Sequence, residues 1–338
     1  MMRPWLAPLN LLYGAGVAWR NHRIESGAEP VQRLAWPVLS IGNLSTGGAG
    51  KTPLTIALAR GLAARGFHVD VLSRGYGRRS NQPARVDPHG TAAGFGDEPL
   101  EIARATGLPV YVAPQRYQAG LLAESEAGTG AANGEPRRLH LLDDGFQHRQ
   151  LHRDVDILLL SARDLADRLL PAGNLREPLA NLRRATVLAV PADEPEVEQW
   201  LRRPLPAAGN RPEKRWPGPI WRLRRRMEAP AVEGPVLAFC GIACPEQFFA
   251  GLQALGLELI VRVPFADHYH YRERDLKQLA ARAREAGAVA LVTTEKDRAR
   301  LGRLALAGMP LEAAELRTEI EDAPAALDWL VKRLAQQD

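Results

Sequence analysis

The sequence predicts an α/β protein in which strands and helices alternate, and three observations support that prediction. Apolar runs of strand length recur along the chain, and helical patterns lie between them. A glycine-rich loop separates the first of these runs, residues 38–41, from a helical pattern that begins near Leu54. The chain has 338 residues and is 46% hydrophobic, which is enough for one large or two ordinary α/β domains. We therefore expect a parallel-sheet domain followed by a second, smaller α/β domain.

Charge and cysteine content restrict the kinds of partner and compartment. The net charge is +5, from 44 lysines and arginines against 39 acidic residues, and lysine occurs at only five positions. This arginine excess favours an anionic partner: phosphate, an acidic membrane surface or nucleic acid. Cys240 and Cys244 are the two cysteines, too few for a zinc site by themselves, so free thiols in a reducing cytoplasm are favoured.

Residues 4–19 are apolar and rich in aromatic side chains, with basic residues on both sides. The stretch is shorter than the roughly 20 residues that a spanning helix needs, and it lacks the small-residue cleavage site of a signal peptide. In a helix, Trp5, Leu9 and Leu12 fall near one face. Two interpretations remain open: residues 1–30 form a helix that lies in a bilayer interface, or a helix that docks on the protein's own core.

The glycine-rich loop has the form of a phosphate-binding P-loop. A strand, the loop and the start of a helix follow one another directly, which is the context that the motif requires. Lys51 would reach the β- and γ-phosphates of a nucleotide, and the Thr52 hydroxyl would bind Mg²⁺. Ser45 replaces the usual first glycine, and an ordinary glycine-rich turn is the alternative. The predicted nucleotide-binding residues are Ser45, Thr46, Gly47, Gly48, Ala49, Gly50, Lys51 and Thr52.

The segments after the P-loop helix continue the alternation. Residues 68–72 form a predicted strand, and a polar loop extends to about Phe95. Asp97 and Glu98 then open a helix, where acidic residues in the first turn are favourable. We expect a short strand at 109–112, a helix at about 117–127 and a linker at 128–138.

The next apolar run, residues 139–142, ends in Asp143 and Asp144. Parallel α/β sheets bind ligands at the carboxyl ends of their strands, and a carboxylate that holds Mg²⁺ belongs at this edge. Many strands end in an acid before a turn, so the acid pair indicates a Mg²⁺ site only in combination with the P-loop. Further buried strands are predicted at 156–160 and 185–190, and the loop at 170–178 between them carries Arg176.

A Pro- and Arg-rich pattern between Pro191 and Pro230 marks a domain junction. No G-x-S-x-G elbow is present to anchor a hydrolase triad, and the guanine-reading N-K-x-D motif is absent, so an adenine nucleotide is favoured. The predicted division of the chain is an N-terminal helix at 1–30, a P-loop NTPase-like domain at 31–215, a connecting segment at 216–230 and a C-terminal α/β domain at 231–338.

Six segments together resemble the tetraacyldisaccharide 4′-kinase family of Gram-negative bacteria. They are residues 45–52, 96–99, 143–148, 171–178, 267–269 and 293–297. The resemblance covers nearly the whole chain, and the Asp-Asp-Gly-Phe-Gln-His sequence joined to the P-loop is its most specific part. It implies ATP-dependent phosphorylation of the 4′-hydroxyl of a tetraacylated glucosamine disaccharide 1-phosphate, a step of lipid A biosynthesis.

The resemblance also implies roles for individual residues. Lys51 and Thr52 would act on ATP and Mg²⁺, with Glu98 and either Asp143 or Asp144 completing the metal environment. Asp97 would be the catalytic base, His268 its partner, and Arg176 a stabiliser of the charge that is transferred. The partners would be the anionic lipid A precursor and the cytoplasmic face of the inner membrane, as for a peripheral enzyme, without nucleic acid. This favours the interfacial interpretation of residues 1–30.

Two other functions are consistent with parts of the sequence. A membrane-associated P-loop ATPase that acts as a switch would need no small-molecule acceptor, but Thr46 stands where partition-type ATPases carry an extra lysine. A nucleic-acid-binding NTPase could use the basic, tryptophan-containing residues 202–226, although no recognised nucleic-acid module accompanies them.

Overall fold

The computed structural model describes residues 4–47, 50–128, 137–205, 215–242, 244–267, 269–301 and 308–336. Its strands are β1 (Val38–Asn43), β2 (His68–Ser73), β3 (Ala84–Arg85), β4 (Val110–Val112), β5 (Arg138–Asp143), β6 (Val155–Leu159), β7 (Val187–Pro191), β8 (Ile220–Glu228), β9 (Val236–Cys240), β10 (Leu259–Pro264), β11 (Ala290–Thr294) and β12 (Leu311–Ile320). Its α-helices are α1 (Leu9–Glu25), α2 (Lys51–Ala63), α3 (Ala92–Phe95), α4 (Asp97–Thr106), α5 (Arg116–Ala127), α6 (Ala162–Leu165), α7 (Pro195–Leu201), α8 (Pro245–Ala254), α9 (Glu273–Glu285), α10 (Glu295–Leu301) and α11 (Ala323–Ala335). Two 3₁₀ segments are η1 (Pro4–Leu6) and η2 (Leu179–Arg184).

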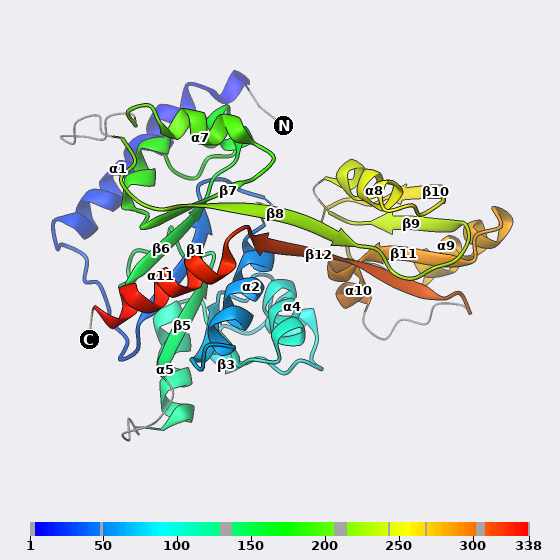
Figure 1. Cartoon of the computed structure of the whole chain (residues 1–338), viewed down its shortest axis with the longest axis horizontal. Helices are drawn as coiled ribbons and strands as arrows, with labels where there is room; N and C mark the ends of the chain where they lie inside the picture. The colour runs from blue at the N-terminus through cyan, green and yellow to red at the C-terminus, as the bar shows by residue number, and fades with distance from the viewer. Residues whose placement is uncertain are drawn as a thin grey trace.

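These strands join in one sheet, in the order β10-β9-β11-β12-β8-β7-β6-β1-β5-β2-β4-β3. Figure 1 shows that the sheet passes through two bodies, a larger one that holds both ends of the chain and a smaller one with α8, α9 and α10. We call them the P-loop half and the second half. The predicted fold class, an α/β protein with a P-loop domain and a smaller α/β domain, is confirmed.

The P-loop half is built around β1, which lies between β6 and β5 and is parallel to both. Every residue of β1 is buried, as expected for a strand covered on both faces. Leu39 and Ile41 pack with α2 and α4 on one face, and Val38 packs with α5 on the other. Because the loops after β1 and β5 leave from the same edge of the sheet, the P-loop and the Asp143-Asp144 pair meet there.

The second half has its own core on both faces of β9. Val236, Ala238 and Cys240 pack with α8 on one face, whereas Leu237 and Phe239 pack with α9 on the other. The strands β10, β9, β11 and the start of β12 are parallel. This half is therefore a small βαβ unit with its own hydrophobic clusters, as the pattern beyond residue 231 predicts.

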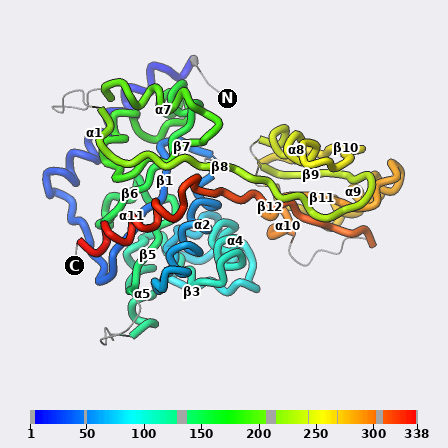
Figure 2. The backbone as a smooth tube through the Cα atoms, in the orientation of Figure 1, coloured from blue at the N-terminus to red at the C-terminus, as the bar shows by residue number. Residues whose placement is uncertain are grey.

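Two long strands connect the halves, and they are traced easily along the backbone in Figure 2. β8 pairs in parallel with β7 through residues 220–223 and then antiparallel with β12 through residues 223–228. β12 pairs with β11 through residues 311–314 before it reaches β8. The chain then returns to the P-loop half as α11, where Leu327, Leu330 and Leu334 join the cluster that contains the α2 core. The predicted domain boundaries, with residues 231–338 as one C-terminal domain, remain a prediction. The last helix, α11, packs on the core of the P-loop half and not on that of the second half.

The N-terminal helix α1 presents two different faces. On one side Tyr13 Oη donates to the carbonyl oxygen of Arg176 at 3.1 Å, and Val17 and Asn21 are buried. On the other, Leu11, Leu12 and Trp19 are exposed. Trp5 is exposed too, but it lies in η1 before α1 begins, so it does not share a helix face with Leu9 and Leu12 as the sequence predicted. Within the described part of the chain, no helix is long and apolar enough to cross a membrane.

Candidate active site

The loop between β1 and α2 has the backbone conformation of an anion-binding turn. Gly47 and Gly50 adopt φ values of +110° and +86°, which favour glycine, and Gly50 is the N-cap of α2. α2 has no acidic residue in its first turn, so its N-terminal N–H groups and dipole favour a phosphate. The Thr46 N–H donates to the Asn174 carbonyl oxygen at 2.8 Å, which fixes the loop against the 170–178 segment. The predicted residues Gly48 and Ala49 lie outside the described residues.

Lys51 is held at the same edge of the sheet. Its Nζ donates to Asn43 Oδ1 at 3.0 Å and lies 3.5 Å from Asp144 Oδ1. Asn43 ends β1, and its own Nδ2 donates to Ser45 Oγ at 3.1 Å. The ammonium therefore sits between the ends of β1 and β5, where it can reach phosphates cradled by the loop. Asn43 is a site residue that the motif reasoning did not assign.

Asp143 and Asp144 occupy different electrostatic environments although they are adjacent. Burial, followed by the nearby Glu98 and Asp144 carboxylates, raises the pKa of Asp143 to about 7. Burial would also raise the pKa of Asp144, but Lys51 and Arg176 outweigh it and hold that pKa below its usual value. Asp143 is thus the carboxylate that gains most from an added cation.

These residues fit a Mg²⁺ ion bound with a nucleotide. Among the described residues no three acidic, histidine or cysteine side chains converge as a metal cluster. Mg²⁺ does not need one, since it usually takes one or two carboxylates, substrate phosphates and several waters. Asp143, with only 2% of its surface exposed, is a suitable carboxylate ligand, and Glu98 is near enough to raise its pKa. Thr52, buried on the first turn of α2, offers a hydroxyl as a further ligand.

Arg176 joins the 170–178 segment to the acid pair. Its Nη1 donates to Asp144 Oδ2 at 3.0 Å and to Gln147 Oε1 at 3.1 Å. Gln147 Nε2 donates in turn to the Asn43 carbonyl oxygen at 2.9 Å. The predicted residues Lys51, Asp144 and Arg176 therefore share one hydrogen-bonded network.

Three further side chains at this edge, Arg116, His148 and Arg225, were given no specific role by the sequence analysis. Arg116 begins α5 and is buried near Asp144, and burial lowers its pKa. Burial and then the nearby arginines, Arg116 first, lower the pKa of His148 to about 4, so the imidazole is neutral at pH 7. Arg225 reaches the P-loop from β8, since a Cβ placed on Gly50 would lie 3.5 Å from its Nη2. Only their positions near the carboxyl edge of the sheet could have indicated from the sequence that these residues belong to the site.

Asp97 meets the second half of the molecule. It follows Gly96, whose φ of +92° lets the backbone pass close to Gly75. Arg300 on α10 donates from Nε to Asp97 Oδ2 at 3.1 Å. The family resemblance implies His268 as the partner of Asp97; His268 lies outside the described residues, so that pairing stays a prediction. Arg300 was not predicted.

Comparisons with known proteins point to one family. The family described as tetraacyldisaccharide-1-P 4′-kinase matches residues 2–335. A tetraacyldisaccharide 4′-kinase of Koribacter versatilis is 42% identical over 335 residues, covering 96% of this chain and 97% of its own length. One from Parvibaculum lavamentivorans is 41% identical, covering 93% and 87%. A crystal structure titled as an "apo" form of LpxK from Aquifex aeolicus in complex with ATP is similar with a TM-score of 0.76 and 32% identity, covering 99% of this chain and 100% of that one.

Proposed function

The chain belongs to the tetraacyldisaccharide-1-P 4′-kinase family, and we propose from its site how its residues divide the work of that reaction. The enzyme transfers a phosphoryl group from ATP to the 4′-hydroxyl of a tetraacylated glucosamine disaccharide 1-phosphate in lipid A biosynthesis. The observation that carries this proposal is the network at the ends of β1 and β5, where Lys51, Asp144 and Arg176 meet at the P-loop.

The nucleotide is held through its phosphates. The β1–α2 loop and the N-terminus of α2 bind phosphate oxygens, and Lys51 bridges toward the β- and γ-phosphates. Asp143 and the Thr52 hydroxyl would hold Mg²⁺, with Glu98 and Asp144 close by, and the ion would neutralise phosphate charge. The raised pKa of Asp143 supports this assignment, because a cation would favour the ionised carboxylate.

The acceptor is a sugar hydroxyl, which is a poor nucleophile unless it is positioned and relieved of its proton. Its oxygen forms the new bond to the γ-phosphorus as the bond to the β-bridging oxygen breaks, its proton passes to Asp97, and ADP leaves. Arg176 offsets the charge that spreads over the transferred group. The switch-type ATPase alternative assigns no role to a catalytic base, and the family membership does not favour it.

We assign substrate capture to α1. Each CH₂ group that leaves the bilayer costs about 0.8 kcal/mol, so a tetraacylated substrate stays in the membrane and the enzyme must come to it. The exposed Trp5, Leu11, Leu12 and Trp19 supply an apolar face for that contact, and the arginine excess suits anionic headgroups. The working location is then the cytoplasmic face of the inner membrane, as a peripheral protein.

The proposal is tested by ATP consumption and product formation. Purified protein is supplied with ATP, Mg²⁺ and tetraacyldisaccharide 1-phosphate in mixed micelles, and ADP release is followed with and without the lipid. We expect ADP release to depend on the lipid and to match the amount of phosphorylated product. ADP release that is independent of the lipid would support the ATPase switch instead.

A further inference from the structure

Two ion pairs join the start of α4 to α10 of the second half, and we call these four residues the α4–α10 clasp. Asp97 pairs with Arg300, and Glu101 pairs with Lys296 through Oε2 and Nζ at 3.7 Å. In each helix the two residues are four positions apart, so they lie on one face. The first acid of α4 pairs with the later cation of α10, which means that the two helices run in opposite directions.

Arg300 is the more rigidly held of the two cations. Only 5% of its side chain is exposed. Its Nη1 donates to the Gly241 carbonyl oxygen at 2.8 Å and to Asp297 Oδ1 at 3.1 Å. Asp297 is fully buried and accepts from Thr294 Oγ1 at 2.8 Å through its other oxygen. The planar guanidinium is thus anchored in the second half while its Nε reaches Asp97 in the P-loop half.

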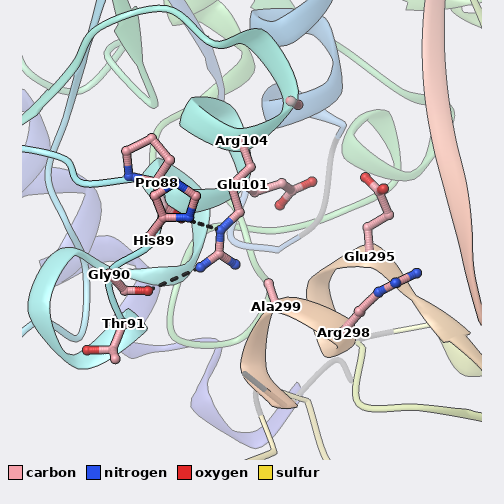
Figure 3. Close-up of a pocket in the computed structure, with 10 residues that line it drawn as sticks. Pro88, His89, Gly90, Thr91, Glu101, Arg104, Glu295, Arg298 and Ala299 are labelled. Atoms are coloured by element: carbon pink, nitrogen blue, oxygen red, sulfur yellow. Dashed lines mark hydrogen bonds between the residues drawn. The ribbon is translucent and has the colours of Figure 1, made fainter. Parts of the chain in front are cut away.

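Beside the clasp the two halves are separated by a cavity of about 830 Å³. Figure 3 shows Glu101 and Arg104 on one side of it, with Glu295 and Arg298 on the other. Arg104 contributes to its own half, where it donates to the carbonyl oxygens of Pro88 and Gly90. Among the described residues on this side, the clasp supplies two ion pairs between the halves, and Asp97 is the clasp residue to which we assign a catalytic role.

We propose that Arg300, which belongs to the second half, is a positioning residue for the catalytic base Asp97. An N–H donor on Oδ2 fixes the rotation of the carboxylate at the first position of α4, where a displacement of about 1 Å can cost on the order of a hundredfold in rate. The guanidinium also offsets negative charge next to Glu98. The inference rests on the proposed role of Asp97 as the base.

The test is a double-mutant cycle on kcat with Arg300→Gln, Asp97→Asn and both changes together. We expect Arg300→Gln to lower kcat about a hundredfold while KM for ATP changes less than about twofold. In the Asp97→Asn enzyme, the same change at Arg300 lowers kcat no further, because its effect acts through Asp97. Arg300→Lys, which keeps the charge but lacks the planar fork, restores part of the rate.

A matched control is Arg298→Gln, which removes an exposed cation from the same helix and leaves kcat unchanged. Equal losses from Arg300→Gln in the presence and absence of Asp97 would overturn the inference, as would a fully active Arg300→Gln enzyme beside an inactive Asp97→Asn enzyme. A fully active Asp97→Asn enzyme would instead overturn the base assignment, and the inference with it. If Arg300→Gln fails to fold, the Arg300→Lys cycle gives the same comparison.

Discussion

At the scale of single residues, the site concentrates opposite charges around the ends of β1 and β5. Lys51 Nζ lies 3.5 Å from Asp144 Oδ1, and Arg176 Nη1 lies 3.0 Å from Oδ2 of the same carboxylate. Such an arrangement holds the cations in place before phosphates arrive, so little rearrangement is needed when charge moves. Asp143 is left as the carboxylate whose pKa is raised and whose charge a metal ion would balance.

The first prediction concerns Lys51. Lys51→Ala should lower kcat by about two to three orders of magnitude, because it removes a preorganised positive charge from the phosphates. Its thermal midpoint should change little, since Lys51 contacts polar groups at the edge of the sheet. The measurement is lipid-dependent ADP release, with Lys277→Ala, an exposed lysine on α9, as the control. A Lys51→Ala enzyme with near-normal turnover would show that the nucleotide site is misplaced.

The second prediction concerns a buried histidine far from the P-loop. His140 Nδ1 lies 2.5 Å from Asp70 Oδ1, and Nε2 lies 3.4 Å from Glu124 Oε1. Burial by itself lowers the pKa of His140, but Asp70 and then Glu124 outweigh burial and raise it to about 9. The unfolded value is about 6.5, so the folded state binds the extra proton between these values. Its stabilisation is complete below about pH 6.5 and is lost as the pH rises through 9.

The test compares unfolding of the natural chain and His140→Gln at pH 6 and pH 9.5. We expect the variant to be less stable at pH 6 by on the order of 3 kcal/mol, and the difference to shrink at pH 9.5. Urea denaturation with a fluorescence readout measures both values. An equal difference at the two pH values would mean that His140 is neutral in the folded protein.

The residues that could be predicted from the sequence are those carried by contiguous motifs. Lys51 and the acid pair follow directly from strand, loop and helix order, and Arg176 follows from the family resemblance. Arg116 and Arg300 could not be predicted, because each reaches the site through tertiary contact from a segment without a motif. Asn43 lies directly before the P-loop, but the motif does not specify that its side chain accepts a hydrogen bond from Lys51. The spacing of residues along the chain does not show which distant segments the fold brings to the site.

At the scale of elements, α1 combines features of both interpretations that the sequence left open, an interfacial helix and a helix docked on the core. Tyr13 and Val17 face the protein, while Leu11 and Leu12 are 81% and 72% exposed. The helix therefore docks on the P-loop half and still keeps an apolar face outward. Hydrophobic periodicity alone could not separate these two faces, because both are apolar in sequence.

The third prediction tests that division. Changing Trp5, Leu11 and Leu12 to serine should weaken binding to anionic vesicles by at least about tenfold, because each apolar side chain contributes roughly 1.5–3 kcal/mol when fully buried. The thermal midpoint and KM for ATP should stay unchanged, and apparent KM for the lipid should rise. Val17→Ser, on the docked face, is the control and should lower the midpoint instead. Vesicle co-sedimentation gives the binding, and unchanged co-sedimentation of the triple variant would contradict an interfacial role.

At the scale of the whole molecule, the chain crosses between the halves twice. β8 leads out of the P-loop half and β12 leads back, and α11 then covers α2. Alternating strand and helix patterns predicted the existence of both halves and most of their elements. They could not show that the last helix returns, since an amphipathic pattern specifies an apolar face and not the core that receives it.

The last prediction follows from this return of the chain. The two halves have separate hydrophobic clusters, so we expect calorimetry to resolve two unfolding transitions. ATP with Mg²⁺ should raise the midpoint temperature of only the transition that belongs to the P-loop half.

Two variants assign the transitions. Leu330 is fully buried in α11, and Leu252 is fully buried in α8. Each Leu→Ala change removes about 2–5 kcal/mol of stability. Leu330→Ala should therefore lower the ATP-responsive transition although residue 330 follows the second half in sequence, whereas Leu252→Ala should lower the other. The reverse assignment would place α11 energetically with the second half, and a single transition lowered equally by both changes would mean that the connecting strands make the molecule one cooperative unit.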